Sequence, residues 1–535
     1  MTRLRRFIKA GFLAVLLVAW PAQGFAVKNL VYCTEASPEG FDPGLYAAAV
    51  TYDASSQPVY NRLVEFERGT TKLVPALATD WQISDDNLEY TFHLRKGVKF
   101  QTTRFFTPTR EFNADDVIFS FERQWKKDNP WYNYLAGADW LYFNSMELGG
   151  LLKSVEKVDD YTVKVTLTRP EAPFLADLAM DFMSIMSKEY ADHLQKTGQM
   201  ELLNQQPLGT GPFIFENYQK DAVIRFRANP DYFRGKQPLD NLIFAITLDT
   251  SVRTQKLKAG ECQVVAQPAF NDISEMRANP RFKVLDQAGV NIAYLAYNTE
   301  EPPFNKVEVR RALNMAINKQ AIIDAVYFGS GIPAKSPLPP TVWGYDDDLP
   351  ADVYDPEKAK QMLADAGVHN LKMQLWAMPI ATQSMPNGRR AAELIQADLR
   401  KIGVESEIIS MEWGEYLRAA KAKGRDGAAI MVWTGDNGDP DNFLGTLTSC
   451  GAIDTNNYAR WCDPEFDALT AKAKATSNHE ERVKLYKQAQ RMFREKAPWL
   501  LIAHSTVFAV MSDKVKGYLI NPVGARRFDG VDLEQ

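Results

Sequence analysis

Long hydrophobic runs are scarce in this chain of 535 residues. The first one extends from Gly11 to Trp20 and is too short to span a bilayer, which takes about 20 residues. Basic residues precede it, and Gly24 and Ala26 supply the small side chains that a signal peptidase reads. Residues 1–26 therefore have the pattern of a secretory signal peptide. No later run is long enough for a transmembrane helix, so the sequence predicts a protein that is exported and soluble after cleavage.

An excess of basic charge is also missing. The chain has 62 Lys and Arg against 67 Asp and Glu, and the signal peptide holds four of the basic residues, so 58 against 67 remain, a net charge of −9. Such a surface attracts neither nucleic acid nor an anionic membrane. The 509 residues after the signal peptide are too many for one hydrophobic core, and we expect two or three lobes.

Cysteine and histidine are few, with four and five residues respectively. An even number of Cys in an exported chain suggests two disulfides, and three pairings are possible. Cys450 and Cys462 are close in sequence and favour a bond with each other, which would leave Cys33 with Cys262. A zinc site is disfavoured, because no Cys-x-x-Cys or His-rich spacing occurs.

Motifs of catalysis are missing as well. The sequence has no Gly-x-Ser-x-Gly, no His-Glu-x-x-His and no phosphate-binding loop, and its His residues are scattered. We therefore predict a binding protein without catalytic residues, cofactor or metal. An exported peptidase is the alternative from a different functional class.

Apolar periodicity predicts alternating strands and helices, which is typical of an α/β protein. We expect strands at residues 29–33, 88–94, 155–157, 161–167, 291–298, 372–376, 405–409, 429–433 and 500–511. We expect helices at residues 54–65, from Asn113 onward, and at 306–316, 319–327, 356–366, 387–402 and 480–495. The order of elements in the second half predicts a small α/β lobe with a partly parallel sheet.

This order of elements divides the mature chain into two lobes. The first lobe is discontinuous and enlarged by an extra subdomain, and it comprises residues 27–290 and 504–535. The second lobe is inserted into it, at residues 291–503. Two strands would cross between the lobes, and such a hinge permits closure over a ligand.

The segment from Trp433 to Phe443 is the most informative for function. It follows an apolar strand, and ligands of open α/β sheets bind at the carboxyl ends of strands. Asp436, next to a flexible Gly and near a Trp, could hold an ammonium group. The segment has three acids within six residues, but their spacing does not fit a calcium-binding EF-hand loop. A solvated turn remains an alternative interpretation, and Trp413 is a second candidate for which we favour a place in the core.

Several segments resemble the large peptide-binding class of ABC-importer solute receptors, known as family 5. The resemblance extends from about Asn29 to the end of the chain. It rests on Tyr60–Phe66, Tyr90–Phe100, Ala114–Phe121, Thr168–Phe182, Gly209–Phe213 and Trp433–Phe443.

The resemblance implies a two-lobed periplasmic-binding-protein clamshell with two hinge crossovers, and the same pairing of the four Cys. It also implies a monomer that delivers di- or oligopeptides to permease subunits in the inner membrane. Asp436 would bind the α-ammonium group of the peptide, and Trp413 would line the pocket for a side chain. The segment Trp433, Thr434 and Gly435 would supply main-chain contacts.

One departure from the class concerns the ligand's carboxylate. Receptors of this class that bind dipeptides clamp it with an Arg, and the corresponding position here is Thr382. The first-lobe segment with Ala47 and Ala49 is also smaller and more apolar. Either Arg389 or Arg390 reaches the carboxylate, or the ligand is longer, modified or blocked there, or the protein binds another solute such as haem. We expect a peptide-like solute with a free amino group and no tightly clamped carboxylate, with a haem receptor as the alternative.

Overall fold

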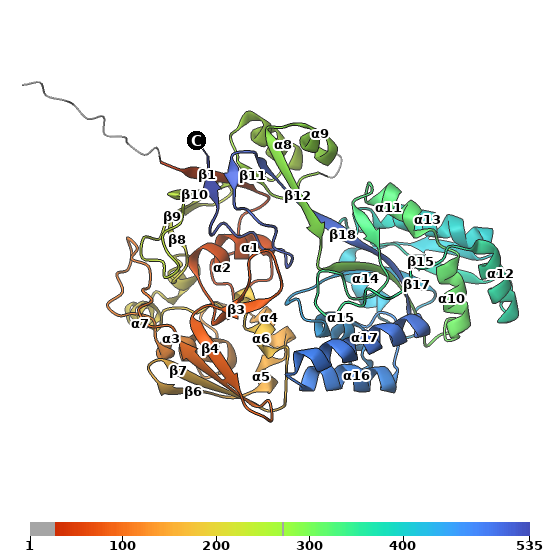
Figure 1. The fold of residues 1–535 in the computed structure, drawn as a ribbon, viewed down its shortest axis with the longest axis horizontal. Coiled ribbons are helices and arrows are strands. Elements are labelled where there is room, and N and C mark those ends of the chain that lie inside the picture. The colour runs from red at the N-terminus through yellow and green to blue at the C-terminus, as the bar shows by residue number, and fades with distance from the viewer. Residues whose placement is uncertain (1–26, 138, 270–271, 535) are drawn as a thin grey trace, which may run out of the picture.

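The computed structural model describes residues 27–137, 139–269 and 272–534, so the predicted signal peptide lies outside the described residues. The described part of the chain forms two lobes that share one twelve-stranded sheet (Figure 1). This is the two-lobed α/β architecture that the sequence predicts. Every helix within the described ranges is too short or too polar to cross a membrane.

The large sheet runs through both lobes. Its strands are β1 (Asn29–Thr34), β8 (Phe213–Gln219), β9 (Val223–Ala228), β10 (Asn241–Ile246), β11 (Val264–Val265), β12 (Phe282–Ala288), β13 (Asn291–Tyr297), β14 (Gly331–Pro333), β15 (Lys372–Trp376), β16 (Glu405–Ile409), β17 (Ala428–Thr434) and β18 (Trp499–Ser512). They lie in the order β16-β15-β17-β13-β18-β11-β1-β10-β9-β8, and β12 and β14 also pair with β18.

Strand β18 is the main connection between the lobes. Its first part, from Trp499 to Ala503, pairs with β13, and its last part, from Thr506 to Ser512, pairs with β12. Strand β12 continues into β13 through Gly289 and Val290. The chain therefore crosses between the lobes in two strands, as Figure 1 shows.

The first lobe adds further elements to its part of the large sheet. A four-stranded antiparallel sheet has the order β4 (Ala78–Ile83), β5 (Glu89–Leu94), β7 (Thr162–Leu167) and β6 (Leu152–Asp159). Two smaller pairs are β2 (Val64–Phe66) with β3 (Leu73–Pro75) and β19 (Val515–Lys516) with β20 (Asp532–Leu533). The helices are α1 (Ala49–Ala54), α2 (Ser56–Val59), α3 (Ala114–Trp125), α4 (Leu141–Ser145), α5 (Leu148–Leu151), α6 (Phe174–Asp177), α7 (Lys188–Thr197), α8 (Thr250–Ala259) and α9 (Ile273–Ala278).

The second lobe surrounds its strands with helices. Strands β15 and β16 pair in parallel, β15 and β17 also pair in parallel, and β17 is antiparallel to β13, so the predicted partly parallel sheet is present. The helices are α10 (Val307–Met315), α11 (Lys319–Val326), α12 (Pro356–Asp365), α13 (Gly388–Lys401), α14 (Trp413–Ala420), α15 (Asp441–Thr448), α16 (Pro464–Ala475) and α17 (His479–Lys496).

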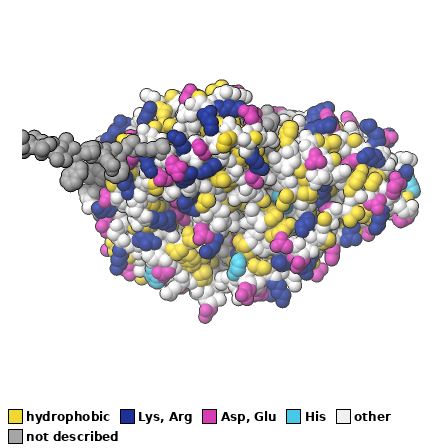
Figure 2. All heavy atoms as spheres, turned by 45° about the horizontal axis from the view of Figure 1, so that its top comes forward, with side chains coloured by type: hydrophobic (Ala, Val, Ile, Leu, Met, Phe, Trp, Pro, Cys, Tyr) yellow, Lys and Arg dark blue, Asp and Glu magenta, His cyan; other side chains and the backbone are white. Residues whose placement is uncertain are grey.

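Two hydrophobic cores stabilise the two lobes. One core takes its residues from Leu30 to Ala266 and from Ala509 to Val531, and the other takes them from Val290 to Ala503. Strand β13 is buried along its whole length, as expected of a strand covered on both faces, and this explains its apolar sequence from Ile292 to Tyr297. Figure 2 shows one face of the surface, on which basic and acidic side chains are interspersed rather than gathered by sign.

Both predicted disulfides are present in the described part of the chain. Cys33 is bonded to Cys262 in the first lobe, where both are buried in a small apolar cluster beside β11. Cys450 is bonded to Cys462 in the second lobe.

The predicted helix over residues 54–65 is wrong. The structure has two short helices that end at Val59, and the chain is then extended into β2. Tertiary contacts decide this conformation, because Val59 accepts a main-chain hydrogen bond from Gly211 and the charged groups of Arg62 and Glu65 are buried among partners from distant segments. A prediction from the local sequence alone cannot take account of such contacts with distant residues.

Candidate ligand-binding site

A cavity of about 210 Å³ lies where the two lobes face each other. The first lobe contributes Ala47 and Ala49 to its wall, and the second lobe contributes Thr434, Gly435 and Asp436. The structure thus brings together five of the eight predicted ligand-binding residues around one cavity. These residues come from segments that are almost 400 positions apart in the sequence.

The loop between β17 and α15 places Asp436 at this cavity. Gly435 donates a main-chain hydrogen bond to Val290 (2.7 Å), and a Cβ on Gly435 would lie 2.7 Å from the ring of Phe443 and 2.7 Å from a methyl group of Val290. Only glycine fits this close approach without displacement of a neighbour. The chain can therefore turn directly from the end of the strand into the cavity wall.

Asn442, on α15, fixes the orientation of this loop. Its side-chain oxygen accepts hydrogen bonds from the main-chain N–H of Asp436 and from the indole N–H of Trp433, both at 3.0 Å. Its amide nitrogen donates to the Asp436 carboxylate at 3.2 Å. Trp433 does not line the cavity. Its indole instead positions Asn442, and Asn442 in turn positions Asp436.

Among the described residues, the carboxylate of Asp436 has neutral side-chain partners only. Besides Asn442, the partner is the hydroxyl of Tyr142, which donates to it from the first lobe at 3.1 Å. Burial raises the pKa of Asp436 to about 6, although the hydrogen bonds from Asn442 and Tyr142 oppose this shift. No Lys, Arg or His of the described ranges forms an ion pair with it. A partly buried carboxylate without a cation is costly to ionise, so the site is suited to a cation supplied by a ligand.

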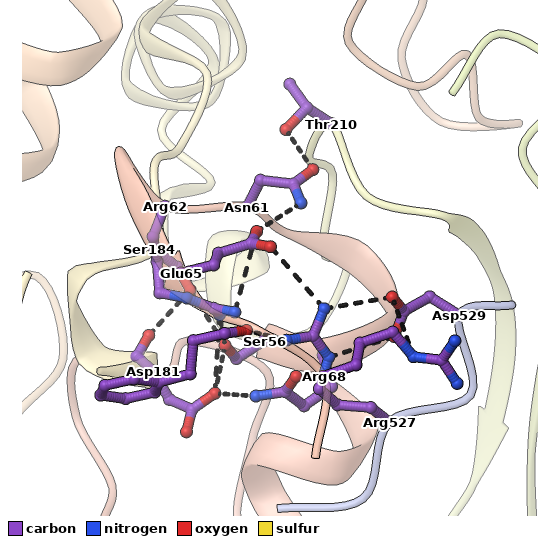
Figure 3. Close-up of polar contacts among 12 residues, drawn as sticks. Ser56, Asn61, Arg62, Glu65, Arg68, Asp181, Ser184, Thr210, Arg527 and Asp529 are labelled. Carbon is purple, nitrogen blue, oxygen red and sulfur yellow. Dashed lines mark hydrogen bonds and ion pairs between the residues drawn. The ribbon is translucent and has the colours of Figure 1, made fainter. Parts of the chain in front are cut away.

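The first lobe lines the same cavity with charged residues that the sequence analysis did not identify. Arg62, Asp181 and Arg527 are among them, and they belong to a network of ion pairs shown in Figure 3. One oxygen of Asp181 accepts hydrogen bonds from Ser56 (2.6 Å) and from the amide of Gln57. For Arg62 there was a signal in the sequence, because Asn61 and Arg62 interrupt the apolar face of the segment before Glu65.

Two predicted residues lie away from this cavity. Trp413 begins α14, stacks on Tyr416 with the ring centroids 5.6 Å apart, and packs against the core of the second lobe, which fits the core interpretation. The hydroxyl of Thr382 accepts a hydrogen bond from the main chain of Met385 (3.0 Å) and so closes a local turn. The loop still reaches the site, because the hydroxyls of Ser384 and Thr434 are 3.4 Å apart.

The two Arg residues considered as substitutes for the missing clamp face solvent. The side chains of Arg389 and Arg390 are 66 % and 50 % exposed, and both form ion pairs with Glu393. Neither of them lines the cavity.

The loop after Asp436 also borders a second, larger cavity of about 830 Å³. Its charged groups are already engaged: Arg482 donates to Asp439 at 2.8 Å, and His479 packs against Trp343. We therefore take the smaller cavity, with its unpaired carboxylate, as the candidate site. Within the described ranges there is no group of three His, Cys, Asp or Glu side chains that could hold a metal ion.

Comparison with known proteins gives consistent matches over nearly the whole chain. Residues 72–455 match the family described as bacterial extracellular solute-binding proteins, family 5. The chain is 51 % identical to the dipeptide-binding protein of Escherichia coli K12 over 531 residues, which covers 98 % of this chain and 99 % of that one. It is 50 % identical to the heme-binding protein A of Haemophilus influenzae, with 96 % and 94 % covered. It is 49 % identical to the di/tripeptide-binding protein 1 of Pseudomonas aeruginosa, with 99 % and 98 % covered.

Solved structures share the same fold. HbpA2 from Haemophilus parasuis superposes with a TM-score of 0.92 at 46 % identity, covering 95 % of this chain and 100 % of that one. A dipeptide-binding protein from Pseudoalteromonas sp. SM9913, in complex with Met-Leu, superposes with a TM-score of 0.77 at 39 % identity, with 95 % and 100 % covered.

Proposed function

The chain belongs to family 5 of the bacterial extracellular solute-binding proteins, and from this membership we propose that it captures small peptides or peptide-like solutes with a free amino terminus for an ABC importer. The observation that carries the proposal is the carboxylate of Asp436, which lies partly buried at the cavity between the lobes and forms no ion pair with the described residues. The α-ammonium group of a peptide would supply that cation. Relatives named for dipeptides and for di- and tripeptides support this choice of ligand.

The proposed roles of the site residues follow from their positions. Asp436 binds the ammonium group, and Thr434 and Gly435 offer main-chain groups beside it. Ala47 and Ala49 form a small apolar wall on the first lobe. Trp433 acts indirectly, because its hydrogen bond to Asn442 helps to orient the carboxylate of Asp436. Trp413 and Thr382 would contact only those parts of a ligand that extend beyond this cavity.

A haem receptor is the second candidate function, favoured by the relative named heme-binding protein A at 50 % identity. The size of the cavity, about 210 Å³, suits a small peptide better than a macrocycle. The site is also organised around an isolated carboxylate, which attracts an ammonium group rather than the anionic side groups of haem.

We further propose that the protein acts by binding alone, as a monomer in the periplasm, after cleavage behind Ala26. The permease subunits of the importer in the inner membrane would be its partners. We place the lobe boundaries at residues 290–291 and 503–504, on the basis of the two cores and the change of partner along β18.

Isothermal titration calorimetry of the ligand-stripped mature protein tests the proposal. We expect dipeptides with a free amino terminus to bind. N-acetylation of the peptide or the substitution Asp436→Asn should each weaken binding by about 100-fold or more, since loss of one partner of a buried charge pair costs ~3–5 kcal/mol. The matched control is Asp348→Asn, which changes a carboxylate that is 81 % exposed and should leave binding unchanged. Equal binding of acetylated peptides, or binding of haem in place of peptides, would contradict the proposal.

A further inference from the structure

A ligand that places its ammonium group at Asp436 also brings a carboxylate into the space between the lobes. The loop of the second lobe offers it no cation, because the hydroxyl of Thr382 closes a local turn and the side chains of Arg389 and Arg390 face solvent. Among the described residues that line the cavity, Arg62 and Arg527 are the basic ones, and both belong to the first lobe.

These two Arg residues belong to a closed network of ion pairs with an uneven charge. Its basic members are Arg62, Arg68, Arg234 and Arg527, and its acidic members are Glu65, Asp181 and Asp529. The described network therefore has four cations and three anions, an excess of one positive charge beside the cavity. Inclusion of Asp436, on the opposite wall, makes the charges equal. Such an arrangement matches a ligand that is itself a zwitterion.

Arg62 is the member of this network with unused hydrogen-bonding capacity. Its side chain is only 4 % exposed, and one of its terminal nitrogens donates to Ser56 at 2.6 Å. Its contacts with Asp181 (3.6 Å) and Glu65 (3.9 Å) are too long for hydrogen bonds, and its Nε has no partner. A guanidinium group has five N–H donors; in Arg62 the donor of Nε is buried without a partner, and those of Nη2 have only the long contact with Glu65. Unsatisfied buried donors of this kind are unusual and point to an absent acceptor.

Arg527, in contrast, has a hydrogen-bond partner for each of its three nitrogens and so holds the network together. It donates two hydrogen bonds to Asp529, both at 3.1 Å, and one to the carbonyl of Phe66 at 2.8 Å. Its role beside the cavity is to add positive potential, whereas Arg62 has donors to offer.

We propose that Arg62, with Arg527 beside it, binds the carboxylate of the ligand, so that the first lobe supplies the clamp that the second lobe lacks. This inference rests on the proposed function and makes its ligand class more specific: zwitterionic peptides with a free carboxylate as well as a free amino group. The ligand then bridges the lobes, with its ammonium group on Asp436 and its carboxylate on Arg62. Closure of the lobes over the ligand then requires both its ammonium group and its carboxylate.

The test compares a dipeptide with the same dipeptide amidated at its carboxyl end, by calorimetry on the mature protein. We expect the wild type to bind the acid about 10- to 100-fold more tightly than the amide, as charge-assisted hydrogen bonds of a buried guanidinium group allow. The substitution Arg62→Gln should reduce this ratio to nearly one by weakening the binding of the acid. Arg62→Lys keeps the charge but loses the planar fork, and it should retain only part of the preference.

The matched control is Arg389→Gln. Arg389 is 66 % exposed, pairs with Glu393 and does not line the cavity, so its loss should leave the preference for the acid unchanged. If Arg62→Gln does not fold, Arg62→Lys and the comparison of the two ligands on the wild type still decide the matter.

The outcomes separate this inference from the proposed function. If the amide binds the wild type as tightly as the acid while N-acetylation abolishes binding, the role of Arg62 is wrong and the proposed function stands. If neither peptide binds, the proposed function is wrong. An unchanged preference for the acid in both Arg62 variants would also overturn the inference.

Discussion

Asp436 lies in the cavity wall with Tyr142 and Asn442 as donors, and its pKa is raised to about 6 by burial. An ammonium ligand binds the ionised form, so below pH 6 the free protein must first lose a proton. We predict that peptide affinity falls by up to about tenfold per pH unit below about pH 6. Affinity should also fall above the pKa of the peptide's amino group, roughly 8, where the ligand loses its charge.

Calorimetry between pH 4.5 and 9 checks this pH dependence. Asp436→Asn serves as the control, because the weak binding that remains should lack the decline on the acidic side. Constant affinity of the wild type from pH 4.5 to 7 would show that an ionised Asp436 is not needed.

At the scale of single residues, the sequence predicts the second-lobe side of the cavity, but of the first-lobe side it predicts only Ala47 and Ala49. Asp436 and Gly435 lie in a short loop whose place after a strand is evident from the sequence. Tyr142, Arg62 and Asp181 come from three distant segments, and only the fold brings them to Asp436. Arg62 has one local signal, because with Asn61 it interrupts an apolar face, whereas nothing in the local sequence of Tyr142 and Asp181 distinguishes them from surface residues.

In the loop between β17 and α15, Gly435 is the position at which we expect substitution to be most disruptive. A Cβ there would lie 2.7 Å from both Phe443 and Val290, which belong to the buried core. We predict that Gly435→Ala lowers the free energy of unfolding by about 1–3 kcal/mol, the usual cost of overpacking, and weakens peptide binding as Asp436 is displaced. Denaturant unfolding and calorimetry measure the two effects.

Gly451→Ala is the matched control for this substitution. A Cβ at Gly451 would have no neighbour within 4 Å, so this change in the same lobe should affect neither stability nor binding. A Gly435→Ala variant with unchanged stability and affinity would mean that the loop adapts without cost.

Among the elements, those with strong local signals were predictable. Asn113 caps α3 and Asn387 caps α13, each with a side-chain hydrogen bond to the first turn, and both helices begin where the sequence indicates. The segment from residue 54 to 65 has an equally helical appearance but is held by Arg62 and Glu65 in buried ion pairs. Contacts between distant residues override the local preference there.

Across the whole molecule, direct contacts between the lobes accompany the shared cavity. Lys474, on the second lobe, forms an ion pair with Glu171 of the first lobe at 2.9 Å, and its carbonyl accepts a hydrogen bond from the main chain of Ala172. Asn437 donates to the buried carboxylate of Asp177 at 2.7 Å. These contacts stabilise the arrangement in which the lobes are together.

We predict that Lys474→Met weakens peptide binding several-fold, mainly through faster dissociation, because it removes the second-lobe partner of the Glu171 carboxylate, which is only 7 % exposed. Stopped-flow tryptophan fluorescence gives the dissociation rate. The control is Lys472→Met on the same helix, a side chain that is 64 % exposed and pairs with Glu481 of its own lobe. Equal dissociation rates for wild type and Lys474→Met would contradict a role for this contact in closure.

The two-lobed arrangement was predictable from the order of strands and helices and from the resemblance to family 5. The positions of the cavities were not, because they depend on how far apart the lobes lie. The unusual length of β18, from Trp499 to Ser512, was visible in the sequence as an apolar run, but its change of partner from β13 to β12 depends on the packing of both lobes.

A crystal structure of the protein with a bound dipeptide tests the central claim most directly. We predict that the peptide lies between the lobes with its ammonium nitrogen about 3 Å from the carboxylate of Asp436. A peptide bound elsewhere, or bound between the lobes with its amino terminus away from Asp436, would contradict the account.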